Sequence, residues 1–301
     1  MADYLLSICI PTYNRCDALS KCIESIVNSE VFASNKIEIV VSDNYSNDNT
    51  PALMNNYCSK SENIHYFRND SNIGGEANFI KVLNCATGKF RKLHNDYSVF
   101  TDSGLRILLN IVATHEKSED LLIFTNGTCL TENRILENLD DFLRTVQWSS
   151  SWIGCYGFWE SDWNEIDNKD RYAEKNFQQI DWFLRVFDNN KQCFIYNDIL
   201  TNRVEFKSSQ GGYNFLKVHI ENFIGMYKPL VNQQKLSRKS ISYVKRKMLP
   251  NMIGWYFIIR KNDKNKFHYD SNNGLAIIIR NYWYYWWFYF DIIKALIKKI
   301  F

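Results

Sequence analysis

The sequence predicts an α/β fold in which helices flank a mainly parallel sheet, followed by a helical C-terminal extension. Up to about residue 125, short β-rich runs alternate with amphipathic helical stretches, which is the pattern of consecutive βαβ units. After Gly211-Gly212 the apolar residues recur at helical spacing instead. With 301 residues, the chain is long enough for one large domain with an elaborated C-terminal half.

Five strands are predicted in the N-terminal part, from runs rich in β-branched and aromatic residues. They cover Tyr4–Ile10, Lys36–Ser42, Ile64–Phe67, Phe90–His94 and Leu121–Thr125. Between them, apolar residues fall on one side of three predicted helices, Arg15–Val27, Thr50–Tyr57 and Glu76–Cys85. Ligands of such sheets bind beyond the carboxyl ends of the strands, so the loops after the strands are the expected place for a site.

The second half of the chain is less regular. Tryptophans crowd between residues 148 and 182, and the clearest elements there are a helix at Asn176–Phe187 and a β-rich run at Cys193–Val204. We expect residues 126–210 to complete the sheet rather than to form a separate domain. Further on, one helix is predicted at Tyr213–Tyr227 and one or two more at Leu236–Arg260.

Composition excludes several classes of protein. The formal net charge of +3 is too small to indicate nucleic-acid binding, and no RNA-binding strand motif or zinc-finger spacing is present. The eight cysteines include no CxxC pair, which favours reduced thiols in a cytosol. Met1-Ala2-Asp3 is acidic and the apolar run after it is short, so no signal peptide is predicted.

Three motifs carry a resemblance to a known family. Ser7-Ile8-Cys9-Ile10-Pro11-Thr12-Tyr13-Asn14-Arg15, Val40-Val41-Ser42-Asp43-Asn44 and Asn72-Ile73-Gly74-Gly75 follow one another in the family's order. In this respect the chain resembles the family 2 inverting glycosyltransferases of bacterial surface polysaccharide synthesis, which build O-antigen or capsule. The resemblance covers about residues 4 to 125 and extends weakly to about 205.

The resemblance implies a GT-A fold, with a Rossmann-like sheet, and transfer of a sugar from a UDP- or dTDP-sugar to an acceptor. The acceptor implied is a saccharide on a polyprenyl diphosphate carrier, at the inner face of the bacterial cell membrane. The chain then divides into three parts: 1–125 as the nucleotide-sugar-binding half, 126–210 as the acceptor-binding half, and 211–301 as a helical extension.

For the nucleotide, the resemblance implies that Pro11, Tyr13 and Arg15 shape the pocket. Asp43, with Asn44 beside it, would accept a hydrogen bond from the base. The residue types suit these roles, since an arginine binds a diphosphate well. The alternative is that Asp43-Asn44 only makes a turn and caps the next helix.

The glycine turn is the second part of the implied donor site. Gly74 and Gly75 let the backbone approach a ligand or take a positive φ, and amides at a helix start favour phosphate. Asn78, early in the following helix, would face the donor. A glycine pair by itself would be a weak signal.

The segment Lys92-Leu93-His94-Asn95-Asp96-Tyr97 stands where the family carries two or three aspartates that hold Mg²⁺ or Mn²⁺. Here Asn95 and Tyr97 occupy positions where aspartates are commoner, so Asp96 is the only carboxylate available as a metal ligand and catalytic group. Weak metal binding, metal-independent catalysis and an inactive binding protein all remain open. His94 is either structural or a ligand.

An inverting transferase also needs a base beside the acceptor hydroxyl. In the family this is a carboxylate from the second half, which makes Asp181 the first candidate, with Asp162 and Glu160 behind it. The alternative for Asp181 is a solvated carboxylate in the first turns of a helix. Gln178, Gln179 and Trp182 could line the acceptor site.

The C-terminal region is basic and aromatic. Lys235 to Lys247 contains six basic residues and no acidic one, and the run from Tyr282 to Phe290 consists of nine aromatic residues. A spanning helix needs roughly 20 apolar residues, so this end is predicted to lie at a membrane surface instead. The alternative is that the aromatics pack on the core or on a second subunit of a homo-oligomer.

Two other functions compete with the transferase. A nucleotidyltransferase has a similar sheet, but its glycine-rich loop with lysine has no counterpart in Pro11-Thr12-Tyr13-Asn14-Arg15. A non-catalytic nucleotide-sugar-binding protein of the same fold is the other alternative, because the carboxylate cluster is poor.

Overall fold

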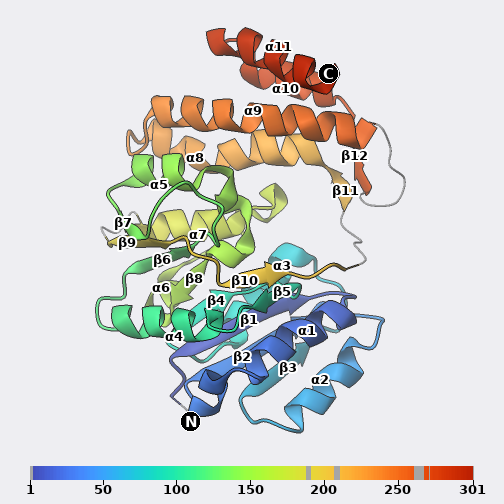
Figure 1. Cartoon of the computed structure of the whole chain (residues 1–301), viewed down its shortest axis with the longest axis vertical. Coiled ribbons are helices and arrows are strands. Elements are labelled where there is room, and N and C mark those ends of the chain that lie inside the picture. The colour runs from blue at the N-terminus through green and yellow to red at the C-terminus, as the bar shows by residue number, and fades with distance from the viewer. Residues whose placement is uncertain (1–2, 188–190, 207–210, 261–267, 271, 301) are drawn as a thin grey trace. The chain divides into compact units, whose positions relative to one another are not determined.

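The computed structural model describes residues 3–187, 191–206, 211–260, 268–270 and 272–300 (Figure 1). The chain forms two compact units that interleave along the sequence. Unit 1 comprises Met1–Glu137, Trp152–Ala173 and Gln178–Lys207. Unit 2 comprises Asn138–Ser151, Glu174–Phe177 and Ser208–Phe301.

The main sheet of unit 1 has the strand order β3-β2-β1-β4-β8. Its first four members are parallel: β1 (Leu6–Thr12), β2 (Ile37–Asp43), β3 (Ile64–Arg68) and β4 (Phe90–Leu93). Strand β8 (Gly157–Trp159) adds to β4 in the antiparallel direction. Every residue of β1 and β2 is buried, as expected of central strands covered on both faces. The prediction of a mainly parallel α/β sheet is confirmed.

Helices cover this sheet because each presents an apolar stripe. In α1 (Cys16–Val27), the residues Leu19, Cys22, Ile23 and Ile26 join the core formed with the strands. The other predicted helices are α2 (Thr50–Cys58), α3 (Gly75–Cys85) and α7 (Gln178–Phe187). Two helices of unit 1 were not predicted, α4 (Gly104–His115) and α6 (Glu160–Glu165).

The remaining strands of unit 1 form two smaller sheets. Strand β6 (Leu121–Phe124) pairs in parallel with β9 (Cys193–Tyr196), and β7 (Arg134–Leu136) runs antiparallel to β9. Strand β10 (Thr201–Arg203) pairs antiparallel with β5 (Ser98–Phe100), directly after β4. The predicted β-rich run at Cys193–Val204 is therefore two strands in two different sheets. Of the strands in residues 126–210, β8 completes the main sheet, whereas β7 and β9 form a separate sheet with β6.

Unit 2 is mainly helical. It contains α5 (Leu139–Val146), α8 (Phe223–Asn232), α9 (Arg238–Arg260), α10 (Gly274–Tyr282) and α11 (Trp286–Ile300) (Figure 1). The loop before α9 binds α5, since Asp140 accepts from the Ser237 hydroxyl at 2.6 Å. Arg246 of α9 pairs with Asp291 of α11 at 2.8 Å. Among the described residues, none of the helices has the length and apolar character needed to cross a bilayer.

The single helix predicted at Tyr213–Tyr227 is wrong. The segment begins as β11 (Gly211–Asn214), which pairs with β12 (His268–Asp270), and passes through a π-helical turn, η5 (Lys217–Asn222), into α8. Tyr213 and Phe215 pack on Tyr269, with both pairs of ring centroids 5.1 Å apart. This tertiary contact favours an extended start, and helical periodicity does not reveal it.

Candidate functional site

The strand order places a switch point at β1. Strands β2 and β3 follow on one side of β1 and β4 lies on the other, so the loops after β1 and β4 lead in opposite directions at the carboxyl ends of the strands, which is where open α/β sheets bind ligands. Three side chains meet there. The Asp96 carboxylate accepts from the Thr12 hydroxyl at 2.8 Å and from Arg15 Nη1 at 3.0 Å. Asp96 is only 1% exposed, whereas 20% of the Arg15 side chain remains exposed.

The charge of Asp96 is set by opposing influences. Burial is the largest and raises the pKa of its carboxyl, while Arg15 and the Thr12 hydroxyl lower the pKa and compensate only in part. Both carboxylate oxygens already accept hydrogen bonds. Asp96 therefore holds Arg15 in position at the switch point.

Beside this trio, two rings stack. The Tyr97 and Phe206 centroids are 4.7 Å apart, with the ring planes 19° from parallel. The Arg15 guanidinium carbon lies 4.8 Å from the Phe206 centroid, and that of Arg203 lies 5.4 Å from it. Arg203 and Phe206 arrive from β10 and the residues after it, more than a hundred positions from Arg15.

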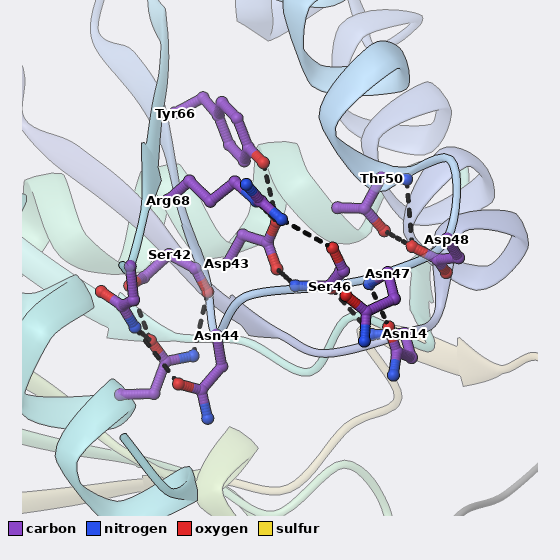
Figure 2. A network of polar contacts seen from close by, with 12 residues as sticks. Asn14, Ser42, Asp43, Asn44, Ser46, Asn47, Asp48, Thr50, Tyr66 and Arg68 are labelled. Atoms are coloured by element: carbon purple, nitrogen blue, oxygen red, sulfur yellow. Dashed lines mark hydrogen bonds and ion pairs between the residues drawn. The ribbon is translucent and has the colours of Figure 1, made fainter. Parts of the chain in front are cut away.

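Asp43, at the end of β2, is the centre of a polar network (Figure 2). Its carboxylate accepts from the Ser46 amide at 2.9 Å and from the Tyr66 hydroxyl at 2.7 Å, and lies 3.6 Å from Arg68 Nε. Asp43 is fully buried. The bond to Ser46 makes the turn that the sequence offered as an alternative. The role of Asp43 in recognising a base stays a prediction.

A different carboxylate accepts the hydrogen bonds at the start of helix α2. Asp48 accepts from the Thr50 amide at 3.0 Å and from the Thr50 hydroxyl, and Figure 2 shows both bonds. Asp48, the residue before the N-cap Asn49, therefore bonds the first amide of the helix, and Asp43-Asn44 does not cap it. Nearby, Asn14 and Asn47 join the loops after β1 and β2, since the Asn47 amide donates to Asn14 Oδ1 at 2.7 Å.

The glycine turn before α3 is fixed by asparagines. Asn44 Oδ1 accepts from the Ile73 amide at 2.8 Å, and Asn78 Nδ2 donates to the Ser42 carbonyl at 2.9 Å. Gly74 has φ +86°, and a Cβ built on Gly74 or Gly75 would meet no atom within 4 Å. Open space therefore lies over both glycines, as a site for a ligand requires.

One acid with a buried carboxyl oxygen was not singled out from the sequence. Glu76, at the start of α3, has a buried carboxyl oxygen, Oε2, without a hydrogen-bond partner among the described residues. Burial raises the pKa of this carboxyl to about 8. Gln178 of α7 donates to the Glu76 carbonyl, so α3 and α7 touch at this point.

The predicted base is enclosed by two arginines. The Asp181 carboxylate accepts from Arg171 Nε at 3.0 Å and lies 3.2 Å from Arg185 Nη2. Asp181 is buried rather than solvated, so the alternative of an exposed carboxylate does not hold. Its catalytic role stays a prediction.

The second-choice carboxylates are also paired. Asp162 is buried and lies 2.7 Å from Lys191 Nζ, and burial raises the pKa of its carboxyl. Glu160 is half-exposed and lies 2.8 Å from Arg91. Trp182 is a core side chain, packed at 4.9 Å between centroids on Trp163, so its ring has no exposed face for a sugar.

His94 and Asn95 have mainly structural surroundings. His94 Nε2 lies 3.0 Å from the Ser98 carbonyl, and its ring stacks on Phe100 with centroids 4.7 Å apart. Asn95 is buried, and its side-chain Nδ2 has no partner among the described residues. Pro11 is buried at the end of β1, and Tyr13 is half-buried in the loop beyond it.

The donor set at the switch point does not fit a divalent metal well. Mg²⁺ and Mn²⁺ prefer several oxygen ligands, commonly carboxylates. Asp96 is the one carboxylate between Lys92 and Tyr97, and a guanidinium already occupies one of its oxygens. In the part of the chain that the structure describes, no group of three or more His, Cys, Asp or Glu residues is arranged to hold a metal ion.

Several of these contacts could not be found from the sequence. Thr12 could be suspected as a site residue only because it is the polar residue that ends a buried strand. Nothing in the sequence pointed to Arg203, because only the pairing of β10 with β5 brings it beside Tyr97.

The fold and the site together define a class, α/β proteins with a GT-A fold, and comparison with known proteins supports it. Solved structures with the same fold include TarS of S. aureus, with a TM-score of 0.54 and 14% identity, covering 91% of this chain and 69% of that one. Another is a mannosyltransferase from Pyrobaculum calidifontis in complex with GDP-Man and Mn²⁺, with a TM-score of 0.56 and 12% identity. That match covers 99% of this chain and 88% of the other.

Part of the sequence also matches a family model. Residues 7–121, a little over a third of the chain, match the model of Glycosyl transferase family 2. An abequosyltransferase, RfbV, of Salmonella typhimurium is 37% identical over 108 residues, which are 35% of this chain and 31% of that protein. A GalNAc(5)-diNAcBac-PP-undecaprenol beta-1,3-glucosyltransferase of Campylobacter jejuni is 30% identical over 128 residues, 42% of this chain and 38% of that protein. The matched stretches thus span about a third of these relatives.

Proposed function

We propose that this chain is an inverting glycosyltransferase that moves a sugar from a UDP- or dTDP-sugar to a saccharide in bacterial surface polysaccharide synthesis. The observation that carries the proposal is the meeting of Thr12, Arg15 and Asp96 at the switch point, inside the region that matches family 2. TarS has been solved with UDP-GlcNAc, which supports a nucleotide-sugar donor. The name of the Campylobacter relative contains an undecaprenol-linked saccharide, which supports a polyprenyl-diphosphate-linked acceptor.

In the proposed donor complex, the base lies toward Pro11, Tyr13 and Asp43, and the diphosphate lies at Arg15. Asp96 is a positioning residue for Arg15, because it fixes the guanidinium through a hydrogen bond at 3.0 Å. The open space above Gly74 and Gly75 gives the donor room next to the first amides of α3. No step is assigned to a metal ion, because the carboxylates present do not fit one.

The proposed reaction is a single displacement. The acceptor oxygen forms a bond to the anomeric carbon as the bond from that carbon to the diphosphate breaks on the opposite face, and the nucleoside diphosphate leaves. Asp181 takes the proton of the acceptor hydroxyl, and Arg171 and Arg185 hold its carboxylate in a fixed orientation.

This proposal is tested by measuring the release of nucleoside diphosphate from a panel of UDP- and dTDP-sugars. The assay is run with and without short saccharide acceptors. Asp181→Asn should lower kcat by about 100-fold or more while the KM for the donor stays unchanged. A purely structural role would instead lower the thermal midpoint and raise the KM together. Nucleotide binding without any release would favour the non-catalytic alternative.

The C-terminal helices support a second part of the proposal, attachment to an anionic membrane surface. The aromatic run divides between two sides: Trp287 and Phe288 are buried, whereas Trp283 is 57%, Trp286 71% and Phe290 63% exposed. Trp286, Phe290 and the exposed Ile293 follow helical spacing and form one face of α11. On α9, the basic residues Arg238, Lys239, Arg246 and Lys247 are exposed, and Arg246, which pairs with Asp291, lies 5.9 Å from the Trp286 ring centroid.

Interfacial aromatics next to exposed cations are typical of peripheral contact with anionic lipid. We expect the full chain to sediment with anionic vesicles, and a Trp286→Ser/Phe290→Ser variant to bind them at least about tenfold more weakly. A Leu130→Ser/Ile199→Ser variant, which removes two exposed apolar side chains of unit 1, is the matched control. Equal binding of both variants would contradict the proposal, and loss of dimers in the first variant would assign the face to a second copy.

A further inference from the structure

We propose that Arg203, together with Arg15, binds the diphosphate of the donor and supplies the positive charge that a divalent cation would otherwise supply. The inference rests on the proposed function and names a residue that the family motifs of the chain do not contain. It follows from the stacked rings of Tyr97 and Phe206, because the two arginines flank them.

The position of Arg203 is fixed by the backbone. Strand β10 runs antiparallel to β5 with Arg203 opposite Ser98, and the Val204 amide donates to the Tyr97 carbonyl at 2.9 Å. The segment that carries Asp96 and Tyr97 is thus tied along its length to the segment that carries Arg203. A paired strand is a firm support for a binding side chain.

Both guanidiniums lie close to the same pair of rings. The Arg15 guanidinium carbon lies 5.7 Å from the Tyr97 centroid and 4.8 Å from the Phe206 centroid. For Arg203 the corresponding distances are 5.2 and 5.4 Å. Each guanidinium is therefore at similar distances from both rings of the stack. Both arginines also act on the Tyr97 phenol, lowering a pKa that burial raises.

The cluster of Arg15, Arg203 and Asp96 contains more positive than negative charge. Asp96 pairs with Arg15, whereas Arg203 is exposed and takes part in no ion pair among the described residues. Arg15 Nε is buried and has no hydrogen-bond acceptor in the described part of the chain. Two guanidiniums near one pair of rings thus share a single carboxylate partner, and unused donors remain.

A diphosphate provides the missing acceptors. Guanidinium groups present forked donors that match phosphate oxygens, and they keep their charge at any physiological pH. When the bond to the sugar breaks, the negative charge that builds on the leaving nucleoside diphosphate would lie beside two fixed cations. The single carboxylate, Asp96, then serves to orient Arg15 and is not required as a metal ligand.

The test is calorimetric titration of UDP, dTDP and GDP, and of the monophosphate of whichever binds most tightly, into the full-length protein. Arg203→Gln should weaken binding of the diphosphate by about tenfold or more, as expected for the loss of charge-assisted hydrogen bonds. Its affinity for the monophosphate should fall less, so the preference for the diphosphate shrinks. Arg203→Lys should recover part of the loss, and addition of Mn²⁺ should leave the wild-type Kd unchanged.

Lys60→Gln is the matched control, because it removes one exposed positive charge from the turn between α2 and β3, and β3 is an edge strand of the main sheet. If Arg203→Gln binds the diphosphate as tightly as wild type and Lys60→Gln, or if Mn²⁺ clearly strengthens binding, the inference is overturned while the proposed function stands. If the wild type binds none of the nucleotides, the proposed function itself fails.

Discussion

Single buried side chains contribute to how the stability of this protein responds to acid. His94 lies in the interior, where burial, helped by Lys92, lowers the pKa of its ring to about 3. An unfolded histidine titrates near 6.5. Below that pH the unfolded state therefore binds a proton at His94 that the native state does not bind. As a result, the free energy of unfolding falls as the pH falls.

We expect His94→Gln to reduce this acid sensitivity. Between pH 6 and pH 4 the wild type should lose up to about 1.4 kcal/mol of unfolding free energy per pH unit through His94 alone. The variant should lose less over the same range, measured by urea denaturation at each pH. His219, with a pKa lowered to about 4, keeps part of the slope in both proteins. Parallel curves for wild type and variant would show that His94 is not protonated on unfolding.

Glu76 predicts the opposite dependence. Its carboxyl keeps a proton up to about pH 8 in the folded state, whereas the unfolded state ionises near 4.3. Between these values the native state binds more protons, so the free energy of unfolding falls as the pH rises. Glu76→Gln, a neutral isostere, should gain stability relative to wild type from pH 5 to about pH 8, by up to about 1.4 kcal/mol per pH unit, and the difference should level off above that pH. A constant difference over this range would contradict the burial of the charge.

For individual residues, the sequence predicted only part of the site. Arg15, Asp43 and Asp96 could be singled out because each follows a predicted strand, and Arg15 and Asp96 prove to be hydrogen-bonded. Arg203 could not be singled out, because its position depends on which strands pair. The orphan oxygen of Glu76 is likewise a property of packing, and an exposed first-turn glutamate would look the same in the sequence.

Among the elements, the start of α3 depends on one glycine. Gly74 has φ +86° and ψ 157°, a region that residues with a Cβ rarely adopt, whereas Gly75 lies within the helix without a positive φ.

Gly74→Ala should therefore cost about 1–3 kcal/mol, and Gly75→Ala should be neutral or slightly stabilising. Denaturant midpoints of the two variants give the comparison, with open space at both positions removing steric clash as an explanation. Equal effects of the two substitutions would contradict a conformational requirement at Gly74.

The elements that the sequence predicted well are those whose pattern reflects simple burial. Strands β1 to β4 and helices α1 to α3 alternate regularly, and their ends differ from the predicted ones by a few residues at most. The segment after Gly211-Gly212 was misjudged because Tyr213 and Phe215 follow contacts with Tyr269, far along the chain. Helix α4 went unpredicted although its residues Leu105, Leu108, Leu109 and Val112 form a buried stripe.

For the whole molecule, the two units do not follow the order of the chain. Helix α5 belongs to unit 2, where Arg144 donates to the Ser240 hydroxyl at 2.7 Å, yet it lies between segments of unit 1. The predicted boundaries at 125 and 210 describe functional parts and stay predictions. A regular pattern of elements cannot show that a helix packs with partners a hundred residues later.

We therefore expect a chain that ends at Lys207 to aggregate. It would expose the apolar face of α5, formed by Leu139, Phe142, Leu143 and Val146. A second truncation, in which a glycine-serine linker also replaces residues 138–151, should elute as a compact monomer in size-exclusion chromatography. Identical behaviour of both truncations would contradict the assignment of α5 to unit 2.

The most direct test of the central claim is a calorimetric titration of UDP, and then dTDP, into wild type, Arg15→Gln and Lys60→Gln. The claim predicts that the wild type and Lys60→Gln bind the same nucleotide with the same Kd, and that Arg15→Gln binds at least about tenfold more weakly. Absence of binding to the wild type, or equal binding by Arg15→Gln, would contradict a donor site at the switch point of the sheet.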